Sequence, residues 1–259
     1  MMPTDAQPDL AVEFREVSYR PDQGPLLLEH LNLAVRRGEL LILLGRSGSG
    51  KTTTLKLINR LLEPSAGEVL VEGRASTDWD AIRLRRMIGY AIQEGGLFPH
   101  FTVELNIGLV PTLEGQRSDA VRERVRELLQ LVGLDPSLGS RYPRDLSGGQ
   151  RQRVGVARAL AADPPILLMD EPFGALDAIT RAGLQREFLG LQQRLNKTII
   201  FVTHDLREAL LLGSRIALLE AGRLVATYTP EEFLNAQDPI AAAYVAAFQT
   251  DYKSCQGGT

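Results

Sequence analysis

The segment that most constrains the fold is Gly45 to Thr52, which reads GRSGSGKT and fits the pattern G-x-x-x-x-G-K-[S/T]. A nearly continuous apolar run, residues 39–44, precedes it, and a helical pattern over residues 52–62 follows it and ends before Pro64. Such an apolar run is typical of a strand that is buried on both faces. A glycine-rich turn can arise by chance, but chance does not supply the strand, the lysine and the helix together. The sequence therefore predicts a strand, a phosphate-binding loop and a helix in succession.

The residue types of this loop suit the binding of phosphate groups. Glycines let backbone N–H groups point inward around an anion, and the positive end of the helix dipole adds to the attraction. Lys51 is expected to neutralise β- and γ-phosphate oxygens, and the Thr52 hydroxyl is expected to ligate Mg²⁺. The expected cofactors are a nucleoside triphosphate and Mg²⁺, and the expected nucleotide-binding residues are Gly45, Ser47, Gly48, Ser49, Gly50, Lys51, Thr52 and Thr53.

A second apolar run, residues 166–169, ends in two acids, Asp170 and Glu171. Strands often end in acids, so this pair alone indicates little. Beside a phosphate-binding loop it predicts that Asp170 holds Mg²⁺ through water. Glu171 is then placed to accept a proton from an attacking water molecule.

Charge and composition exclude some functional classes. The net charge is −3 and the calculated pI is about 5.7, whereas proteins that mainly bind nucleic acid usually carry a basic surplus. We therefore expect no nucleic-acid partner. Cys255 is the only cysteine, so an internal disulfide is excluded. The apolar runs are too short to span a bilayer, so we expect a soluble chain with any membrane role supplied by a partner.

The order of the expected elements predicts the fold class. Apolar strands at residues 39–44, 166–170 and 198–203 alternate with helical segments, which indicates a largely parallel sheet in an α/β domain. Strand patterns at residues 11–20, 26–36 and 67–73 indicate a smaller antiparallel subdomain, and residues 214–219 and 222–228 a hairpin. Residues of about 80–160 are expected to form a mostly helical insert. Asp205 and Glu208 have the spacing of a capping box.

The segment Leu146 to Gln150 reads LSGGQ. Ser147 and the glycines are expected to open a helix, which creates a second helix start suited to an anion. Together with the features above, this segment resembles the signature of the ABC ATPase family, and the resemblance extends from residue 11 to about residue 235. It implies a P-loop ABC ATPase fold with a helical signature subdomain. It also implies that Ser147, Gly149 and Gln150 reach the γ-phosphate that the opposite subunit binds.

Four further positions match the family pattern. The resemblance implies that Tyr19 stacks on adenine, although a lone strand tyrosine is more often a packing residue. Gln93 matches the loop glutamine that senses Mg²⁺ and the water, so Gln93, Thr52 and Asp170 are the expected metal residues. Asp177 ends the GALD loop that crosses the dimer axis. His204 matches the switch histidine that contacts the γ-phosphate, which gives Glu171, His204 and Gln93 as the expected catalytic residues.

One phosphate-binding loop and one signature per chain imply that two chains pair head to tail. The resemblance further implies transmembrane permease subunits and, indirectly, a solute-binding protein, with this chain at the cytoplasmic face of the membrane. The expected division is an N-terminal tail (1–10), the ABC ATPase domain (11–235), and a C-terminal helix and tail (236–259).

In detail, residues 58–64, 89–93, 96–100 and 173–181 resemble ATPases of bacterial osmoprotectant importers, which carry glycine betaine, choline or similar quaternary amines. Many of those relatives add a pair of CBS domains, which we do not expect in this chain. Importers of methionine or polar amino acids are the nearest alternative. A non-transport ABC ATPase, which usually has a long coiled-coil insertion or two cassettes, is a weaker one.

Overall fold

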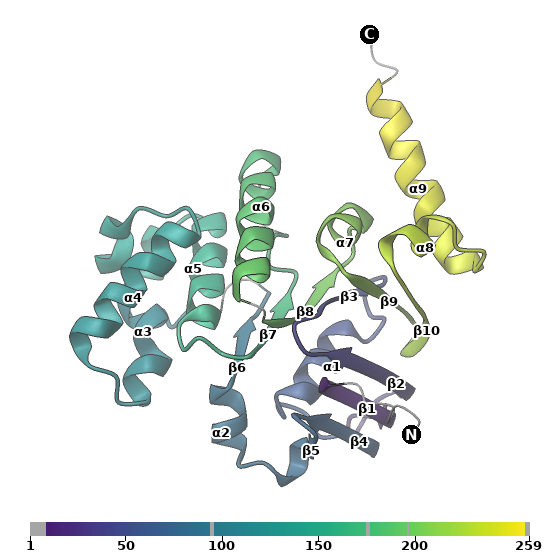
Figure 1. The fold of residues 1–259 in the computed structure, drawn as a ribbon, viewed down its shortest axis with the longest axis horizontal. Coiled ribbons are helices and arrows are strands. Elements are labelled where there is room, and N and C mark those ends of the chain that lie inside the picture. The colour runs from purple at the N-terminus through teal and green to yellow at the C-terminus, as the bar shows by residue number, and fades with distance from the viewer. Residues whose placement is uncertain (1–8, 94–95, 175–176, 196, 257–259) are drawn as a thin grey trace, which may run out of the picture.

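The computed structural model describes residues 9–256, apart from 94–95, 175–176 and 196. Its described strands form two sheets (Figure 1). The larger sheet has the order β10-β9-β3-β8-β7-β6, in which every neighbouring pair is parallel except β10 with β9. Its strands are β3 (Leu40–Leu44), β6 (Ile88–Ala91), β7 (Ile166–Asp170), β8 (Thr198–Thr203), β9 (Arg215–Glu220) and β10 (Arg223–Tyr228).

The smaller sheet is antiparallel and has the order β2-β1-β4-β5. It consists of β1 (Leu10–Tyr19), β2 (Leu28–Arg36), β4 (Ala66–Val71) and β5 (Arg74–Ala75). Both the α/β class and the antiparallel part agree with the expectation from the sequence.

Helices cover the larger sheet, and α3, α4 and α5 gather in a separate layer at one side of the molecule (Figure 1). The helix α9 leaves the body at the opposite side (Figure 1). The helices are α1 (Lys51–Ile58), α2 (Ala81–Arg86), α3 (Val103–Leu113), α4 (Ser118–Leu131), α5 (Gly148–Leu160), α6 (Ala178–Leu195), α7 (Leu206–Leu212), α8 (Pro230–Leu234) and α9 (Pro239–Gln256). Short 3₁₀ turns occupy Ser76–Asp78, Pro136–Ser140 and Pro143–Asp145.

The strand β3 separates two hydrophobic cores. Leu40, Ile42 and Leu44 pack into the core shared with the helical layer. Leu41 and Leu43 pack into the core between the two sheets. Side chains alternate along a strand, so a strand that is covered on both faces needs an apolar residue at every position. This requirement explains the unbroken apolar run that precedes the glycine-rich loop.

Three local expectations differ from the structure. The stretch expected to be mostly helical also contains β6, which pairs with β7 at the edge of the larger sheet. The helix expected over residues 52–62 ends at Ile58, because the backbone N–H groups of Leu61 and Leu62 turn back to the carbonyl of Lys56. The Asp205 side chain caps α7 as expected. Glu208 completes no capping box, since its carboxylate is bound elsewhere.

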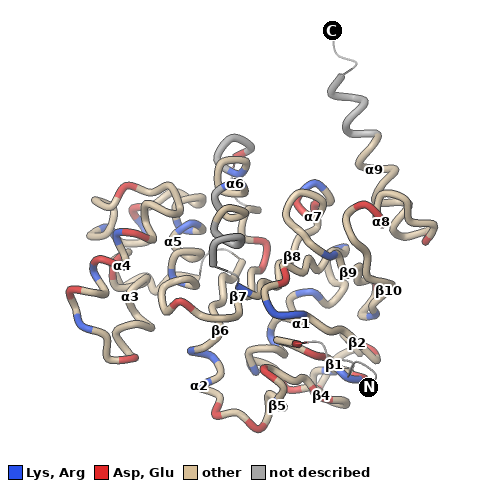
Figure 2. Tube along the Cα trace, viewed as in Figure 1, with Lys and Arg blue, Asp and Glu red and all other residues tan. Residues whose placement is uncertain are grey.

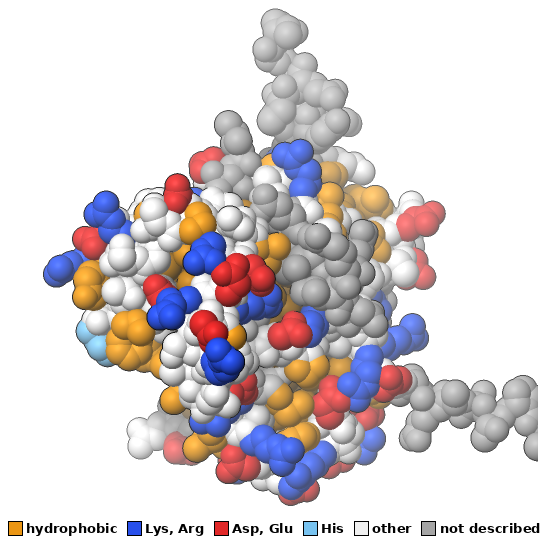
Figure 3. Space-filling model, turned by 60° about the vertical axis from the view of Figure 1, so that its left-hand side comes forward, with side chains coloured by type: hydrophobic (Ala, Val, Ile, Leu, Met, Phe, Trp, Pro, Cys, Tyr) orange, Lys and Arg blue, Asp and Glu red, His pale blue; other side chains and the backbone are white. Residues whose placement is uncertain are grey.

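Basic and acidic residues are interspersed over α2, α4 and the antiparallel sheet (Figure 2). In a space-filling view, hydrophobic side chains lie in patches between charged ones (Figure 3). None of the helices in the described residues is both long and apolar enough to cross a bilayer.

Candidate functional site

The glycine-rich loop connects the end of β3 to the start of α1, and its glycines are structurally required. Gly48 and Gly50 adopt φ angles of +80° and +100°, which side chains other than glycine rarely tolerate. A Cβ atom added to Gly45 would lie 2.4 Å from the carbonyl oxygen of Leu219 and 2.4 Å from Ser49 Oγ. The loop is therefore wedged against the end of β9 and cannot widen on that side.

Lys51 folds back over this loop. Its Nζ donates hydrogen bonds to the carbonyl oxygens of Gly45 at 2.7 Å and Arg46 at 2.9 Å. The residue is only 5% exposed. Burial lowers the pKa of the Lys51 ammonium, while the nearby carboxylates of Glu171 and Asp170 oppose that shift. The loop thus holds a desolvated cation at its centre.

The loop also carries groups that suit an anion. Ser49 Oγ is buried and has no hydrogen-bond partner within the described structure, which leaves a polar group to be satisfied. The space beside Gly48 is open, since an added Cβ there would meet no atom within 4 Å. A phosphate group fits this cradle, because it would accept hydrogen bonds from the loop and face the Lys51 ammonium. Thr53 is half-buried in the first turn of α1.

The acidic pair lies at the end of β7. Asp170 is 2% exposed and accepts a hydrogen bond from Thr52 Oγ1 at 3.1 Å, and its second oxygen lies 3.5 Å from the Tyr90 hydroxyl. Burial is the main cause that raises the pKa of the Asp170 carboxyl, and burial likewise raises the pKa of Tyr90. A hydroxyl beside a carboxylate is an oxygen ligand set that fits Mg²⁺.

Glu171 is held by its backbone and approached by two side chains. Its φ angle is +46°, its N–H donates to the carbonyl of Val202, and its own carbonyl accepts from Gln152 Nε2 at 2.8 Å. Its Oε2 lies 3.4 Å from Gln93 Nε2 and 3.3 Å from His204 Nδ1. The three residues expected to be catalytic therefore meet at one carboxylate oxygen. The positive φ of a non-glycine residue here marks a strained backbone that its surroundings fix.

An open polar cleft collects several of these groups. It is lined by Arg46, Ser47, Gln93, Glu171 and His204, and on the side of the C-terminal helix by Ala243, Tyr244 and Ala247. The cleft therefore joins the glycine-rich loop to the catalytic group and places α9 along its rim.

Other expected residues lie elsewhere in the chain. Ser147 caps α5 through a capping box with Gln150, with hydrogen bonds of 2.8 and 3.2 Å, and both residues face solvent in part or in full, as does Gly149. Within the described chain, neither these signature residues nor Asp177 line the polar cleft. Asp177 is exposed before α6, and its neighbours Ala175 and Leu176 lie outside the described residues.

Tyr19 lies on a strand whose neighbour approaches the glycine-rich loop. It is half-buried at the end of β1 and pairs with Leu28 on β2. A Cβ added to Gly50 would lie 2.6 Å from a methyl carbon of Leu28, so the strand partner of Tyr19 packs against the loop.

Three residues contribute to the site without a signal in the local sequence. Tyr90 approaches Asp170, Gln152 fixes the backbone of Glu171, and Tyr244 lines the cleft. Gln152 lies two residues after Gln150, but nothing in the local sequence shows that it reaches another strand. Only the tertiary fold reveals these three positions.

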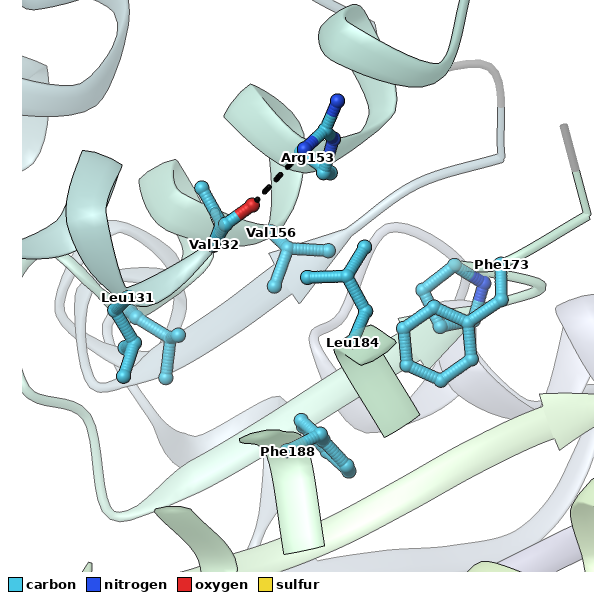
Figure 4. Close-up of a pocket in the computed structure, with 9 residues that line it drawn as sticks. Leu131, Val132, Arg153, Val156, Phe173, Leu184 and Phe188 are labelled. Atoms are coloured by element: carbon cyan, nitrogen blue, oxygen red, sulfur yellow. Dashed lines mark hydrogen bonds between the residues drawn. The ribbon is translucent and has the colours of Figure 1, made fainter. Parts of the chain in front are cut away.

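A separate apolar pocket lies where the end of α4, the helix α5 and the helix α6 meet (Figure 4). Arg153 closes one side of it by donating to the carbonyl of Val132 at 3.5 Å (Figure 4). Its lining is otherwise apolar and shares no residue with the polar cleft. It is lined by Leu131, Val132, Arg153, Val156, Leu160, Pro172, Phe173, Leu184 and Phe188.

A buried strand, a glycine-rich loop, a helix that begins at a lysine and an acidic pair two strands away define the class of P-loop nucleotide-binding proteins. Comparison with known proteins narrows this class. Residues 28–174 match the family model described as ABC transporter.

Curated relatives agree with that match. The chain is 54% identical to the choline transport ATP-binding protein OpuBA of Bacillus subtilis, over 82% of this chain and 56% of the relative. It is 52% identical to the osmoprotectant import ATP-binding protein OsmV of Salmonella typhimurium (80% and 54%). It is 50% identical to the glycine betaine uptake system ATP-binding protein YehX of Escherichia coli (79% and 67%). The chain spans little more than half the length of the first two relatives.

A solved structure shows the same fold. A dimeric post-hydrolysis state of the ATP-binding cassette MJ0796, bound to ADP and Pi, matches with a TM-score of 0.79 and 33% identity over 85% of this chain and 98% of that one. The chain therefore belongs to the ABC transporter family, and it carries the family's nucleotide-binding ATPase domain.

The buried carboxylate of Asp170 makes a stability prediction. The pKa of the Asp170 carboxyl is raised in the folded state. The stability that the protonated carboxyl contributes is therefore fully present below the pKa that this group has in the unfolded chain. It is lost as the pH rises through the pKa that the group has in the folded protein. Without nucleotide or metal, we expect Asp170→Asn to be more stable than the wild type at pH 7, by roughly 0.5–2 kcal/mol. The gain should shrink towards pH 4.

Urea unfolding in a chelating buffer at both pH values measures this difference. Asp22→Asn, at an exposed turn residue, serves as the control and should change little. An Asp170→Asn variant that is less stable than the wild type at pH 7 would show that the buried carboxyl of Asp170 does not lower the free energy of unfolding.

Proposed function

We propose that this chain is the ATP-binding and ATP-hydrolysing subunit of an importer, and that it energises the uptake of a small solute. The observation that carries the proposal is the meeting of Gln93 and His204 at one carboxylate oxygen of Glu171, beside the glycine-rich loop. This group of side chains suits the activation of a water molecule next to a bound phosphate.

The proposed roles follow from the geometry. The Lys51 ammonium exchanges its two carbonyl partners for β- and γ-phosphate oxygens, and Ser47, Ser49 and Thr53 lie in or beside the same cradle. Thr52 and Asp170 would hold Mg²⁺, which would neutralise charge on the phosphates. Glu171 accepts the proton of the attacking water. His204 and Gln93 orient that carboxylate and the γ-phosphate.

A head-to-tail homodimer completes the proposed site. The signature residues of one chain do not line its own described cleft, so a second chain must supply them if they are to reach the nucleotide. Ser147 is exposed at the start of α5, where the helix can approach an anion of a partner. Asp177 is exposed as well and can meet the partner near the two-fold axis.

A groove suits the proposed permease partner. It lies between the helical layer and the larger sheet, and Tyr90, Phe98 and Arg158 are among the residues that line it. Phe98 is 41% exposed, and the Arg158 guanidinium lies 6.0 Å from its ring and donates to the carbonyl of Gly96 at 2.9 Å. An apolar groove with a fixed cation can receive a short helix of a membrane subunit.

The helix α5 connects the three proposed functions. It begins at the signature, carries Gln152 to the backbone of Glu171, and places Arg158 in the groove. A rotation of this helix would therefore act on the dimer interface, the catalytic acid and the permease groove together.

We propose a quaternary-amine osmoprotectant, such as glycine betaine or choline, as the transported solute. The support is the similarity to three ATP-binding proteins named for choline, osmoprotectants and glycine betaine. A methionine or polar amino acid importer remains the alternative. The chain would act at the cytoplasmic face of the membrane, bound to permease subunits that receive solute from a binding protein.

Glu171→Gln tests the proposed base. The amide cannot accept the proton of water, so ATP turnover should fall on the order of 10²- to 10⁴-fold while MgATP still binds. The variant should accumulate as an ATP-bound dimer, which size-exclusion chromatography with light scattering detects. Glu114→Gln at the exposed end of α3 is the control and should keep full turnover. Wild-type turnover by Glu171→Gln would exclude Glu171 as the base.

Ser147→Arg tests the shared site. The bulky cation should block the docking of the partner's γ-phosphate while Lys51 and Thr52 stay intact. Nucleotide binding by the monomer should survive, and dimerisation and hydrolysis should fail. Mixing Ser147→Arg with Lys51→Ala should restore at most one working site per heterodimer. Ser118→Arg, at an exposed position on α4, is the control. Full hydrolysis by Ser147→Arg contradicts the head-to-tail arrangement.

The solute is tested through the binding protein that works with the permease. A cage of aromatic residues there should hold a methylated ammonium by cation–π contacts. Calorimetry should therefore show binding of glycine betaine or choline but not of methionine or glutamine. Uptake measured in a deletion strain should follow the same order. Tight binding of an amino acid with no response to either quaternary amine overturns the solute and leaves the ATPase roles untouched.

A further inference from the structure

A buried polar network lies directly behind His204, outside the polar cleft. Glu208 on α7 accepts a hydrogen bond from Thr203 Oγ1 at 2.6 Å and another from Gln185 Nε2 at 3.2 Å. Thr203, Glu208 and Gln185 are 2%, 6% and 7% exposed. Buried polar groups are costly unless each one is paired, and here each carboxylate oxygen has a donor.

The Thr203 hydroxyl has two tasks. The hydroxyl donates its hydrogen to Glu208. Its oxygen also accepts a hydrogen bond from the backbone N–H of Asp205 at 3.0 Å. These bonds fix the backbone on both sides of His204. His204 itself is exposed, yet its Nδ1 lies 3.3 Å from Glu171 Oε2.

The helix α6 contacts the segment that follows β8 at two residues, Asp205 and Glu208. Gln185 reaches Glu208, and one helical turn earlier Arg181 lies 3.9 Å from the Asp205 carboxylate. The backbone N–H of Arg181 also donates to the carbonyl of Asp177. Residues four apart face the same side of a helix, so one face of α6 contacts this segment.

We propose that Thr203, Glu208 and Gln185 are positioning residues that hold His204 against Glu171. The proposal rests on the role of His204 in the proposed function. Burial raises the pKa of the Glu208 carboxyl, while the hydrogen bonds that Thr203 and Gln185 donate to it oppose that shift. Through α6, the network links the exposed residue Asp177 to residues 203–205 around His204.

A matched pair of variants tests the network. Thr203→Val keeps the shape of the side chain but removes the hydroxyl, which leaves the Asp205 N–H and one Glu208 oxygen unpaired. We expect kcat to fall about 5- to 50-fold, with the affinity for nucleotide little changed. Thr203→Ser restores the hydroxyl and should regain most of the activity. Thr227→Val, the same change at an exposed position of β10, is the control and should have no effect.

A double-mutant cycle separates positioning from general stability. In the His204→Ala background there is no imidazole to position, so Thr203→Val should lower kcat less than about 2-fold. An equal loss in both backgrounds, or a Thr203→Val enzyme as active as the wild type, overturns the proposal. If His204→Ala alone is fully active, the role of His204 in the proposed function is the part that fails.

Hydrogen exchange on the wild-type protein gives a second measurement that does not depend on a folded variant. The Asp205 amide follows an exposed residue but donates to a buried hydroxyl, so it should exchange at least about 100-fold more slowly than an unstructured amide. Exchange at the unprotected rate would falsify the network even if Thr203→Val does not fold.

Discussion

The site depends on the parallel direction of four neighbouring strands. β3, β8, β7 and β6 lie side by side in that order, and in parallel strands the carboxyl ends share one edge of the sheet. Leu44 pairs with Thr203, and Asp170 pairs with Val202, so the ends are nearly level. The glycine-rich loop, the histidine turn, the acidic pair and the loop with Gln93 therefore meet without any one segment having to be long. Inverting any of these strands would carry its group to the far edge.

That arrangement buries ionisable groups, and local hydrogen bonds offset the free energy lost when these groups leave water. The Lys51 ammonium is bound by two loop carbonyls, the Asp170 carboxylate by Thr52, and the Glu208 carboxylate by Thr203 and Gln185. In the proposed function the hydrogen bonds of Lys51 and Asp170 would be replaced, because phosphate oxygens would bind Lys51 and Mg²⁺ would bind Asp170. The pairing of Glu208 has no ligand to exchange with, which is why it suits a positioning role. A protein that keeps such groups at its centre gives up stability for binding.

Local sequence patterns predicted most of the strands of this chain, whereas β6 and the contacts of Glu208 and Gln152 depend on tertiary structure. The apolar strands β3, β7 and β8 and the hairpin of β9 and β10 were predicted, because a strand buried on both faces needs an apolar residue at every position and a glycine marks the turn of the hairpin. β6 was missed as a strand, because four residues that include a glycine show no periodicity. Glu208 had the spacing of a helix cap, but a buried hydroxyl five residues away in sequence captured its carboxylate. The contact of Gln152 with Glu171 has no local signal at all.

The position of β3 in the sheet also bears on how the chain is made. Its neighbours are β8 and β9, and the hydrogen bond from the Gly38 N–H to Thr198 Oγ1 spans 160 residues of sequence. At roughly 5–20 residues per second, a ribosome needs about 8–32 s to synthesise that distance. Throughout that interval, an entirely apolar strand has emerged without either of its partners. The glycine-rich loop is thus synthesised early, but the sheet that supports it forms only after β8 has been synthesised. Until then, we expect the nascent chain to depend on chaperones.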